Sequence, residues 1–124
     1  MTATPTSITC ARIAAEAAFD KLATSVVIID VSERLPFTDL FVIASGETSR
    51  QVRAIKDAID EELNKAGVDR LRREGLEGEA RWVLADYGDI IVHVQHDEER
   101  EFYALERLWA DCPQIDVSDL EGQR

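Results

Sequence analysis

Apolar residues recur at helical spacing in two long segments of the chain. The first, rich in alanine, is predicted to run from an N-cap at Ser7 to about Ala23. In the second, Thr48 and Gln51 fit a capping box, and Gly67 stands where a glycine commonly ends a helix. Its apolar stripe consists of Val52, Ile55, Ile59, Leu63 and Ala66. These patterns predict two helices, each with one face against a core.

Four short apolar runs, rich in β-branched residues, predict strands. They span residues 26–31, 40–44, 81–85 and 90–95. The first two runs are almost wholly apolar, which is typical of strands that are buried on both faces. A two-residue turn at Tyr87 and Gly88 would join the last two runs into a hairpin. Residues 68–80 are expected to form a loop with at most one short strand.

A last helix is predicted to begin at Asp97, because acidic residues suit the positive end of a helix, and to stop before Pro113. A crossover helix between strands implies a parallel pair, and the hairpin adds an antiparallel neighbour. We therefore expect one α/β (α+β) domain over residues 7–112, with a mixed sheet flanked by helices. Residues 1–6 are expected to be frayed, and residues 113–124 to form an acidic, disordered tail.

The hairpin predicts two unlike faces. Its two-residue turn gives a register with three facing pairs: Asp86 with Asp89, Leu84 with Ile91, and Trp82 with His93. One face is then uniformly aliphatic and suits contact with helices. The other carries Trp82 and His93, which suits a partly exposed contact patch, since tryptophan is a frequent hot spot of protein interfaces. The pattern alone leaves an ordinary core position for Trp82 equally open.

The charge and the cysteines exclude several classes of function. The chain has 124 residues, 14 basic and 25 acidic, and a net charge of −11, which argues against direct tracking of nucleic acid phosphates. Cys10 and Cys112 lie far apart, so we expect neither a disulfide framework nor a zinc site, but reduced thiols in a cytoplasmic protein. No signal peptide or membrane-spanning run is apparent. His93 and His96 fit packed or edge positions better than metal ligation.

One motif suggests an enzyme. Residues 43–46, followed by Ser49 and Arg50, resemble the strand–glycine–helix turn of nucleotidyltransferases, where backbone N–H groups hold phosphate. That chemistry needs paired metal-binding carboxylates on the next strand, whereas Asp86 and Asp89 flank a turn. We therefore expect no catalytic, cofactor or metal site, and a turn that only caps its helix. A nucleotide-binding transferase remains the alternative.

Two motifs near the carboxyl end form a specific combination. Residues 88–93 read Gly-Asp-x-x-x-His, and residues 102–109 read Phe-Tyr-x-Leu-Glu-x-Leu-Trp. Further matching segments are Asp30-Val31, residues 41–46, residues 49–52, Glu74-Gly75 and residues 82–84. Together they resemble the ribosomal silencing factor family, also called Iojap-like, over about residues 8–112.

The resemblance implies a fold and a function. The fold would be a mixed five-stranded sheet with helices, related to nucleotidyltransferases but without their catalytic carboxylates. The protein would be a non-enzymatic factor, often homodimeric when free. It would bind the large ribosomal subunit through ribosomal protein fourteen, block joining of the small subunit and lower translation when nutrients are short.

The resemblance also implies contact residues. Trp82 and Tyr103 would be the anchors, and the further members of the patch would be Leu84, Asp89, His93, Arg100 and Glu106. Because the ribosome is a polyanion, an acidic factor has to dock on a protein patch with its acidic tail turned away. We therefore expect binding to weaken only modestly with salt.

Overall fold

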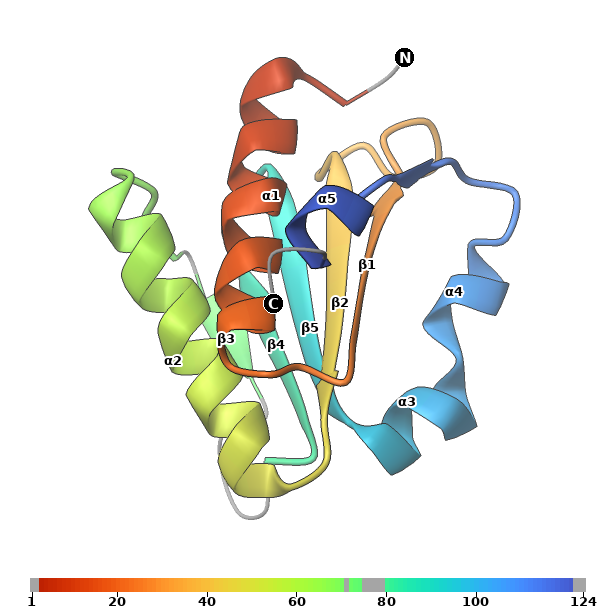
Figure 1. Ribbon diagram of the computed structural model, residues 1–124. Helices are drawn as coiled ribbons and strands as arrows, with labels where there is room; N and C mark the ends of the chain where they lie inside the picture. Colours follow the sequence, from red (N-terminus) through yellow and green to blue (C-terminus); the bar gives the residue numbers. More distant parts are fainter. Residues whose placement is uncertain (1–2, 71, 75–79, 122–124) are drawn as a thin grey trace.

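A six-stranded mixed sheet forms the centre of the molecule, in the strand order β3-β4-β5-β2-β1-β6 (Figure 1). This computed structural model describes residues 3–70, 72–74 and 80–121. The strands are β1 (Ser25–Asp30), β2 (Leu40–Gly46), β3 (Arg72–Glu74), β4 (Trp82–Asp86), β5 (Ile90–His96) and β6 (Gln114–Ile115). Strands β2 and β5 are parallel, and every other neighbouring pair is antiparallel. The predicted mixed sheet flanked by helices is confirmed, and the short β6 is added at one edge.

The helices divide unequally between the two faces of the sheet. They are α1 (Pro5–Asp20), α2 (Ser49–Lys65), α3 (Asp97–Tyr103), α4 (Leu105–Leu108) and α5 (Ser118–Glu121). The long helices α1 and α2 lie side by side over one face, with α5 beside α1, while α3 and α4 lie on the other side (Figure 1). The predicted last helix is therefore two short helices. Ala104, with a left-handed φ of 44°, separates them.

Two apolar clusters follow this division. The larger joins α1, α2 and α5 to the aliphatic sheet face that contains Val83, Val92 and Val94. Four alanines of α1 are completely buried, and their small side chains let the helix approach the sheet closely. The smaller cluster on the opposite face is built on Phe41 and is completed by half-buried residues such as Trp109. The predicted segregation of the hairpin faces is confirmed.

The ends of α2 are confirmed, and the start of α1 is corrected. Thr48 Oγ1 accepts a hydrogen bond from the backbone N–H of Gln51, and Gly67 adopts a φ of 82° just after the helix. In α1 the N-cap is Thr4 rather than Ser7, and Pro5 takes the first helical position, where its missing N–H costs nothing. Ser7 is buried instead, and its hydroxyl donates to Asp39 Oδ2 at 2.8 Å.

The predicted register of the hairpin is wrong by two residues. Leu84 faces His93 and Asp86 faces Ile91, so the connection is longer than a two-residue turn. The reason is the Asp86 side chain, whose Oδ1 accepts the backbone N–H of Gly88 at 2.8 Å and stabilises a wider turn. Because a shift of two preserves the alternation of side chains, each residue stays on its predicted face.

The predicted disorder is wrong for the described parts of both termini. Pro113 accepts the backbone N–H of Asp30 at 2.8 Å, β6 pairs with β1, and Leu120 is buried. At the other end, the Ala3 backbone N–H donates to Asp30 Oδ2 at 3.1 Å. Each terminal segment thus gains hydrogen-bond partners near the end of β1. The predictions that fall on residues 1–2, 75–79 and 122–124 lie outside the described residues.

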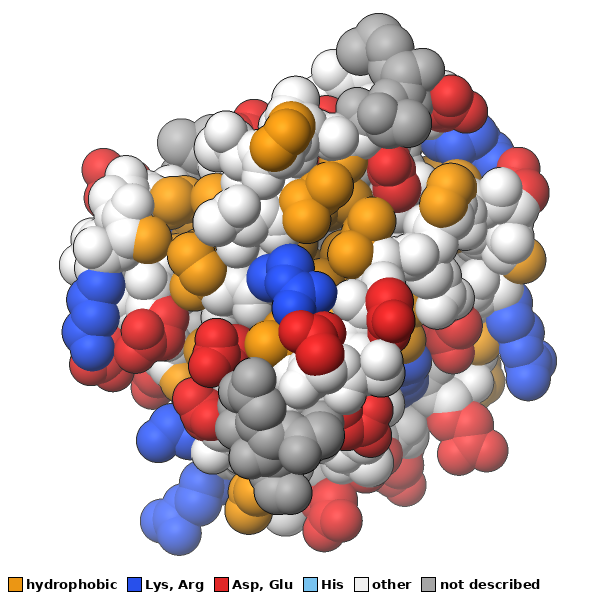
Figure 2. Space-filling view, turned by 45° about the horizontal axis from the view of Figure 1, so that its top comes forward, with side chains coloured by type: hydrophobic (Ala, Val, Ile, Leu, Met, Phe, Trp, Pro, Cys, Tyr) orange, Lys and Arg blue, Asp and Glu red, His pale blue; other side chains and the backbone are white. Residues whose placement is uncertain are grey.

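Three further features concern the cysteines, the length and polarity of the helices, and the charge of the surface. Cys10 is buried, Cys112 is half-buried, and both are free thiols. Within the described ranges, no helix is both long and apolar enough to cross a membrane. Figure 2 views the end of the molecule that lies at the top of Figure 1, and it shows acidic side chains spread widely across that surface.

Candidate protein-binding surface

The hairpin and α3 bring three aromatic side chains together at one end of the sheet. Trp82 opens β4 and faces Gln95 of β5, and α3 begins directly after β5. The rings of Trp82 and Tyr103 lie 4.8 Å apart, and Phe102 meets Tyr103 edge-on at 5.0 Å. We call Trp82, Phe102 and Tyr103 the aromatic surface. Phe102 is 81% exposed and Tyr103 50% exposed, so this apolar area faces outward.

His93 supports the aromatic surface from below. The Trp82 indole Nε1–H donates to His93 Nδ1 at 3.2 Å, which assigns the remaining ring proton to Nε2. The His93 ring is buried and packs edge-on against Phe41 at 4.9 Å. Burial lowers the pKa of His93 to about 4, so the ring is neutral at physiological pH. His93 therefore fixes the orientation of Trp82 rather than offering a contact of its own.

The first turn of α3 is clamped to the start of β4. Arg81 donates from Nε to Glu99 and from Nη2 to Glu98, each at 2.7 Å. The hydrogen bond to Glu98 and the positive charge of Arg81 lower the pKa of the Glu98 carboxyl. The His96 Nδ1 accepts the backbone N–H of Glu98 at 3.1 Å and caps the helix. Since Arg81 precedes Trp82, the clamp holds Tyr103 of α3 against the tryptophan.

The other predicted contact residues do not all gather here. Leu84 is half-buried in the smaller apolar cluster, on the same face as Trp82. Asp89 is exposed at the β4–β5 turn, at the opposite end of the hairpin from Trp82. Arg100 and Glu106 line a separate hollow beside α3 and α4. The structure therefore groups Trp82, Tyr103, His93 and Leu84, and leaves the other three apart.

Phe102 was not among the predicted contact residues, because it shares helical spacing with Leu105 and Trp109, a pattern that is typical of a buried face. Neither α3 nor α4 contains a fully buried residue, and the break at Ala104 turns the two helices differently. A left-handed alanine has no sequence signal, because that conformation is ordinarily signalled by glycine or asparagine.

The turn at Gly46 is filled by the protein's own side chain. Gln51 accepts the Glu47 backbone N–H at 2.7 Å, and its amide donates to the carbonyls of Lys21 and Leu22. A Cβ at Gly46 would meet Gln51 Oε1 at 3.1 Å, so the turn is closely packed. The bonds tie the start of α2 to the end of α1. Among the described residues, no group of three or more side chains is arranged to hold a metal ion.

Comparisons with known proteins agree with these observations. A family described as "Ribosomal silencing factor during starvation" matches residues 4–124. A ribosomal silencing factor of Bacillus subtilis is 41% identical over 106 residues, covering 86% of this chain and 89% of the relative. A crystal structure from Chromobacterium violaceum superposes with a TM-score of 0.77 at 34% identity, covering 82% and 83% of the two chains.

A more distant relative is the mouse protein named "Mitochondrial assembly of ribosomal large subunit protein 1". It is 30% identical over 90 residues, which cover 70% of this chain and 39% of the mouse protein. The match to the family extends through β6 and α5, beyond the segments that first suggested it. This chain belongs to the ribosomal silencing factor family.

Proposed function

We propose that this protein represses translation under nutrient limitation, without enzymatic chemistry, by binding the large ribosomal subunit and blocking the small subunit. The partner would be ribosomal protein fourteen. Membership of the silencing factor family supports repression of translation as the process. The name of the mouse relative supports the large ribosomal subunit as the binding target. The aromatic surface is the structural observation that supports the proposed site of contact with the partner.

The aromatic surface has the properties of an interface hot spot. Trp82 and Tyr103 offer large contact areas with few rotatable bonds, so little side-chain entropy is lost on binding. The hydrogen bond from Trp82 to His93 fixes the indole before a partner arrives. Phe102 and Leu84 extend the apolar area, whereas Asp89, Arg100 and Glu106 lie outside it.

Charge favours a protein partner over ribosomal RNA. The chain carries a net charge of −11, and exposed acidic residues such as Glu98 and Glu101 lie on α3 beside the aromatic surface. Phosphate groups would be repelled there, while a basic rim around an apolar patch of a ribosomal protein would be attracted. This charge distribution supports docking on a protein, with little direct contact to nucleic acid.

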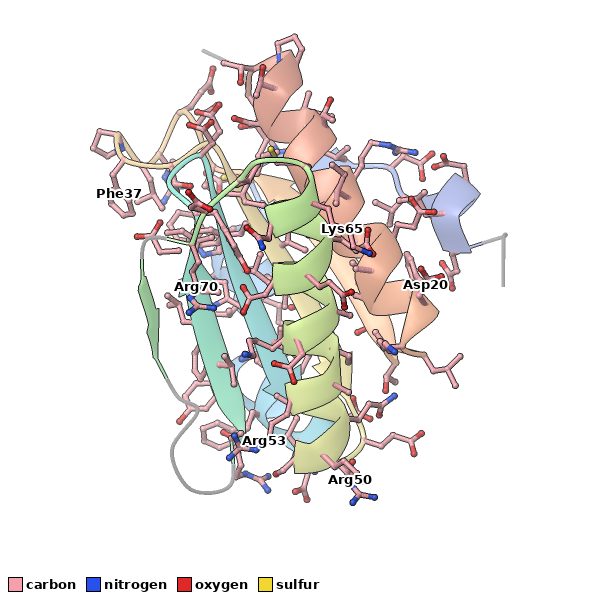
Figure 3. All side chains as sticks on the ribbon, turned by 90° about the vertical axis from the view of Figure 1, so that its left-hand side faces the viewer. Asp20, Phe37, Arg50, Arg53, Lys65 and Arg70 are labelled. Atoms are coloured by element: carbon pink, nitrogen blue, oxygen red, sulfur yellow. The ribbon has the colours of Figure 1, made fainter. Side chains whose placement is uncertain are left out.

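Sedimentation with isolated large subunits tests the partner, and subunit joining tests the function. The protein should pellet with large subunits, and it should reduce the fraction of joined ribosomes in a sucrose gradient. The Phe37→Ala variant is a matched control, because Phe37 is also exposed (65%) but projects from the loop near the start of β2 (Figure 3). Undiminished joining at excess protein would contradict the proposal.

The family resemblance also supports a homodimer in the free state. One copy suffices to block a subunit, so a dimer that covers the aromatic surface would compete with the ribosome. Sedimentation equilibrium of the free protein should give a dimer mass that falls to that of the monomer in the Tyr103→Ala variant. A monomer at all concentrations would remove this part of the proposal.

A further inference from the structure

A polar hollow of about 390 Å³ lies between the end of β2, the start of β1 and the α3–α4 pair. It is separate from the aromatic surface, because neither Trp82 nor Tyr103 lines it. Its polar lining includes Ser25, Ser45, Asp97, Arg100, Glu106 and Arg107. This volume is within the range of small-molecule sites. The hollow therefore has room for a small organic ligand.

Three charged groups around the hollow have unmet hydrogen-bonding capacity. Asp97 Oδ1, Arg100 Nη1 and Glu106 Oε2 are buried atoms without a hydrogen-bond partner among the described residues. The nearest approach of Arg100 to Glu106 is 3.9 Å, longer than a hydrogen bond. Buried charged atoms without partners are costly, so native proteins rarely retain them without a use. Two acceptors and one donor beside the hollow therefore lack a partner among the described residues.

A fourth group provides an independent observation. Gln95 is completely buried, and neither its amide nitrogen nor its amide oxygen has a partner in the described part of the chain. Gln95 of β5 lies directly beside Ser45 of β2, and neighbouring residues at matched positions share a sheet face. Since Ser45 lines the hollow, the Gln95 side chain is directed to the same side. An unpartnered, buried amide thus lies beside Ser45, on the side of the sheet that the hollow occupies.

A hollow of about 480 Å³ near the β4–β5 turn differs in this respect. Its central carboxylate, Asp60, receives a hydrogen bond from the Tyr87 hydroxyl and ion pairs from Arg70 at 2.5 Å and Lys56 at 3.4 Å. These polar groups satisfy one another, so that hollow needs no ligand. The hollow beside α3 and α4 differs because buried polar atoms around it have no hydrogen-bond partner among the described residues.

From these groups we infer that the hollow binds a small zwitterion of the α-amino acid class. The ammonium group would donate to Asp97 and Glu106, and the carboxylate would accept from Arg100. The mixed lining argues against a simple ion, because carboxylates repel an anion and guanidinium groups repel a cation. This site goes beyond the silencing function and does not depend on it.

Backbone NMR of the ribosome-free protein tests the site directly. Titration with glycine, L-serine and L-leucine should give saturable shifts at Ser45, Asp97 and Arg100 with at least one of them. Acetate and methylammonium, which carry only half of the recognised charges, should bind at least tenfold more weakly. Absence of saturable shifts up to about 50 mM, a very weak affinity limit, would overturn the inference. Methylammonium binding as tightly as the amino acids would also overturn it.

Substitutions locate the ligand. Arg100→Gln should raise the Kd at least tenfold, because it removes the charge that would hold the carboxylate. Arg34→Gln is the matched control, since Arg34 follows the far end of β1, about 17 Å along the strand from Ser25. If Arg100→Gln fails to fold, the Glu106→Gln variant on the short α4 provides the same test, and it should also raise the Kd. Wild-type affinity in a folded variant of either residue would refute the assignment.

Discussion

The two faces of the central sheet are built from the same strands but are covered by helices to different extents. On one face, α1 and α2 cover the aliphatic side chains of β5, including Val92 and Val94, almost completely. On the other, which we call the open face, the short helix α3 carries the exposed aromatic side chains Phe102 and Tyr103. One face is thus closed by packing while the other keeps aromatic side chains exposed, and one strand can contribute to both because its alternate residues point to opposite faces.

The largest expected effect lies on the covered face. Ile55 of α2 is completely buried, so Ile55→Ala should lower the free energy of unfolding by about 2–5 kcal/mol through lost burial and a cavity. Urea denaturation measures this. Leu84→Ala, at a half-buried position on the open face, should cost less. Equal costs would contradict the assignment of stability to the covered face.

The second effect is a dependence of stability on pH that originates beneath the open face. Burial lowers the pKa of His93 to about 4, so between about pH 6.5 and 4 the unfolded chain takes up a proton that the folded chain does not. Stability should therefore fall as the pH falls through this range, by on the order of 3 kcal/mol. His93→Asn removes the titrating group and retains an acceptor for Trp82. Denaturation at several pH values should show a shallower slope for this variant, and identical slopes would contradict the role of His93.

The third effect separates binding from folding. Trp82→Ala should weaken binding to large subunits by about 2 kcal/mol if Trp82 is a hot spot. Circular dichroism should show an intact fold, because Trp82 is only half-buried. Phe37→Ala should bind as the wild type does. Binding of Trp82→Ala with wild-type affinity would remove the aromatic surface from the proposed contact.

The smallest effects compare the two N-caps. Thr48→Ala removes the hydroxyl that caps α2 and should lower global stability by about 1 kcal/mol. His96→Ala removes the cap of α3, a helix with no buried residue. Loss of this cap should speed amide exchange within α3 and leave the global unfolding free energy nearly unchanged. A large global loss from His96→Ala would show that α3 is part of the cooperative core.

Much of the covered face could be predicted from sequence, because local signals determine it. The capping box at Thr48 and the glycine at position 67 mark the ends of α2, and alternation placed Val83 and Trp82 on opposite faces. The Trp82 half of the candidate site was reached in the same way. Tyr103 came from family resemblance, since it lies off the apolar stripe.

The features that could not be predicted depend on distant or individual contacts. The register of the hairpin depends on the Asp86 carboxylate and the Gly88 backbone, which alternation does not reveal. Strand β6 has two residues, and its partner β1 is at the other end of the chain. The left-handed Ala104, which exposes Phe102, has no local signal either.

The pairing of β6 with β1 has a consequence for synthesis and folding. One side of β1 stays open until residues 114–115 have left the ribosome, so this edge of the sheet forms after the other described strands have been synthesised. A chain cut before Pro113 would retain the open edge of a β-branched strand, which is a template for aggregation. The acidic residues Asp116, Asp119 and Glu121 lie beyond that edge, and their charge discourages pairing between nascent chains. The segment that contains β6 thus covers an edge of β1, which is the first of the described strands to be synthesised.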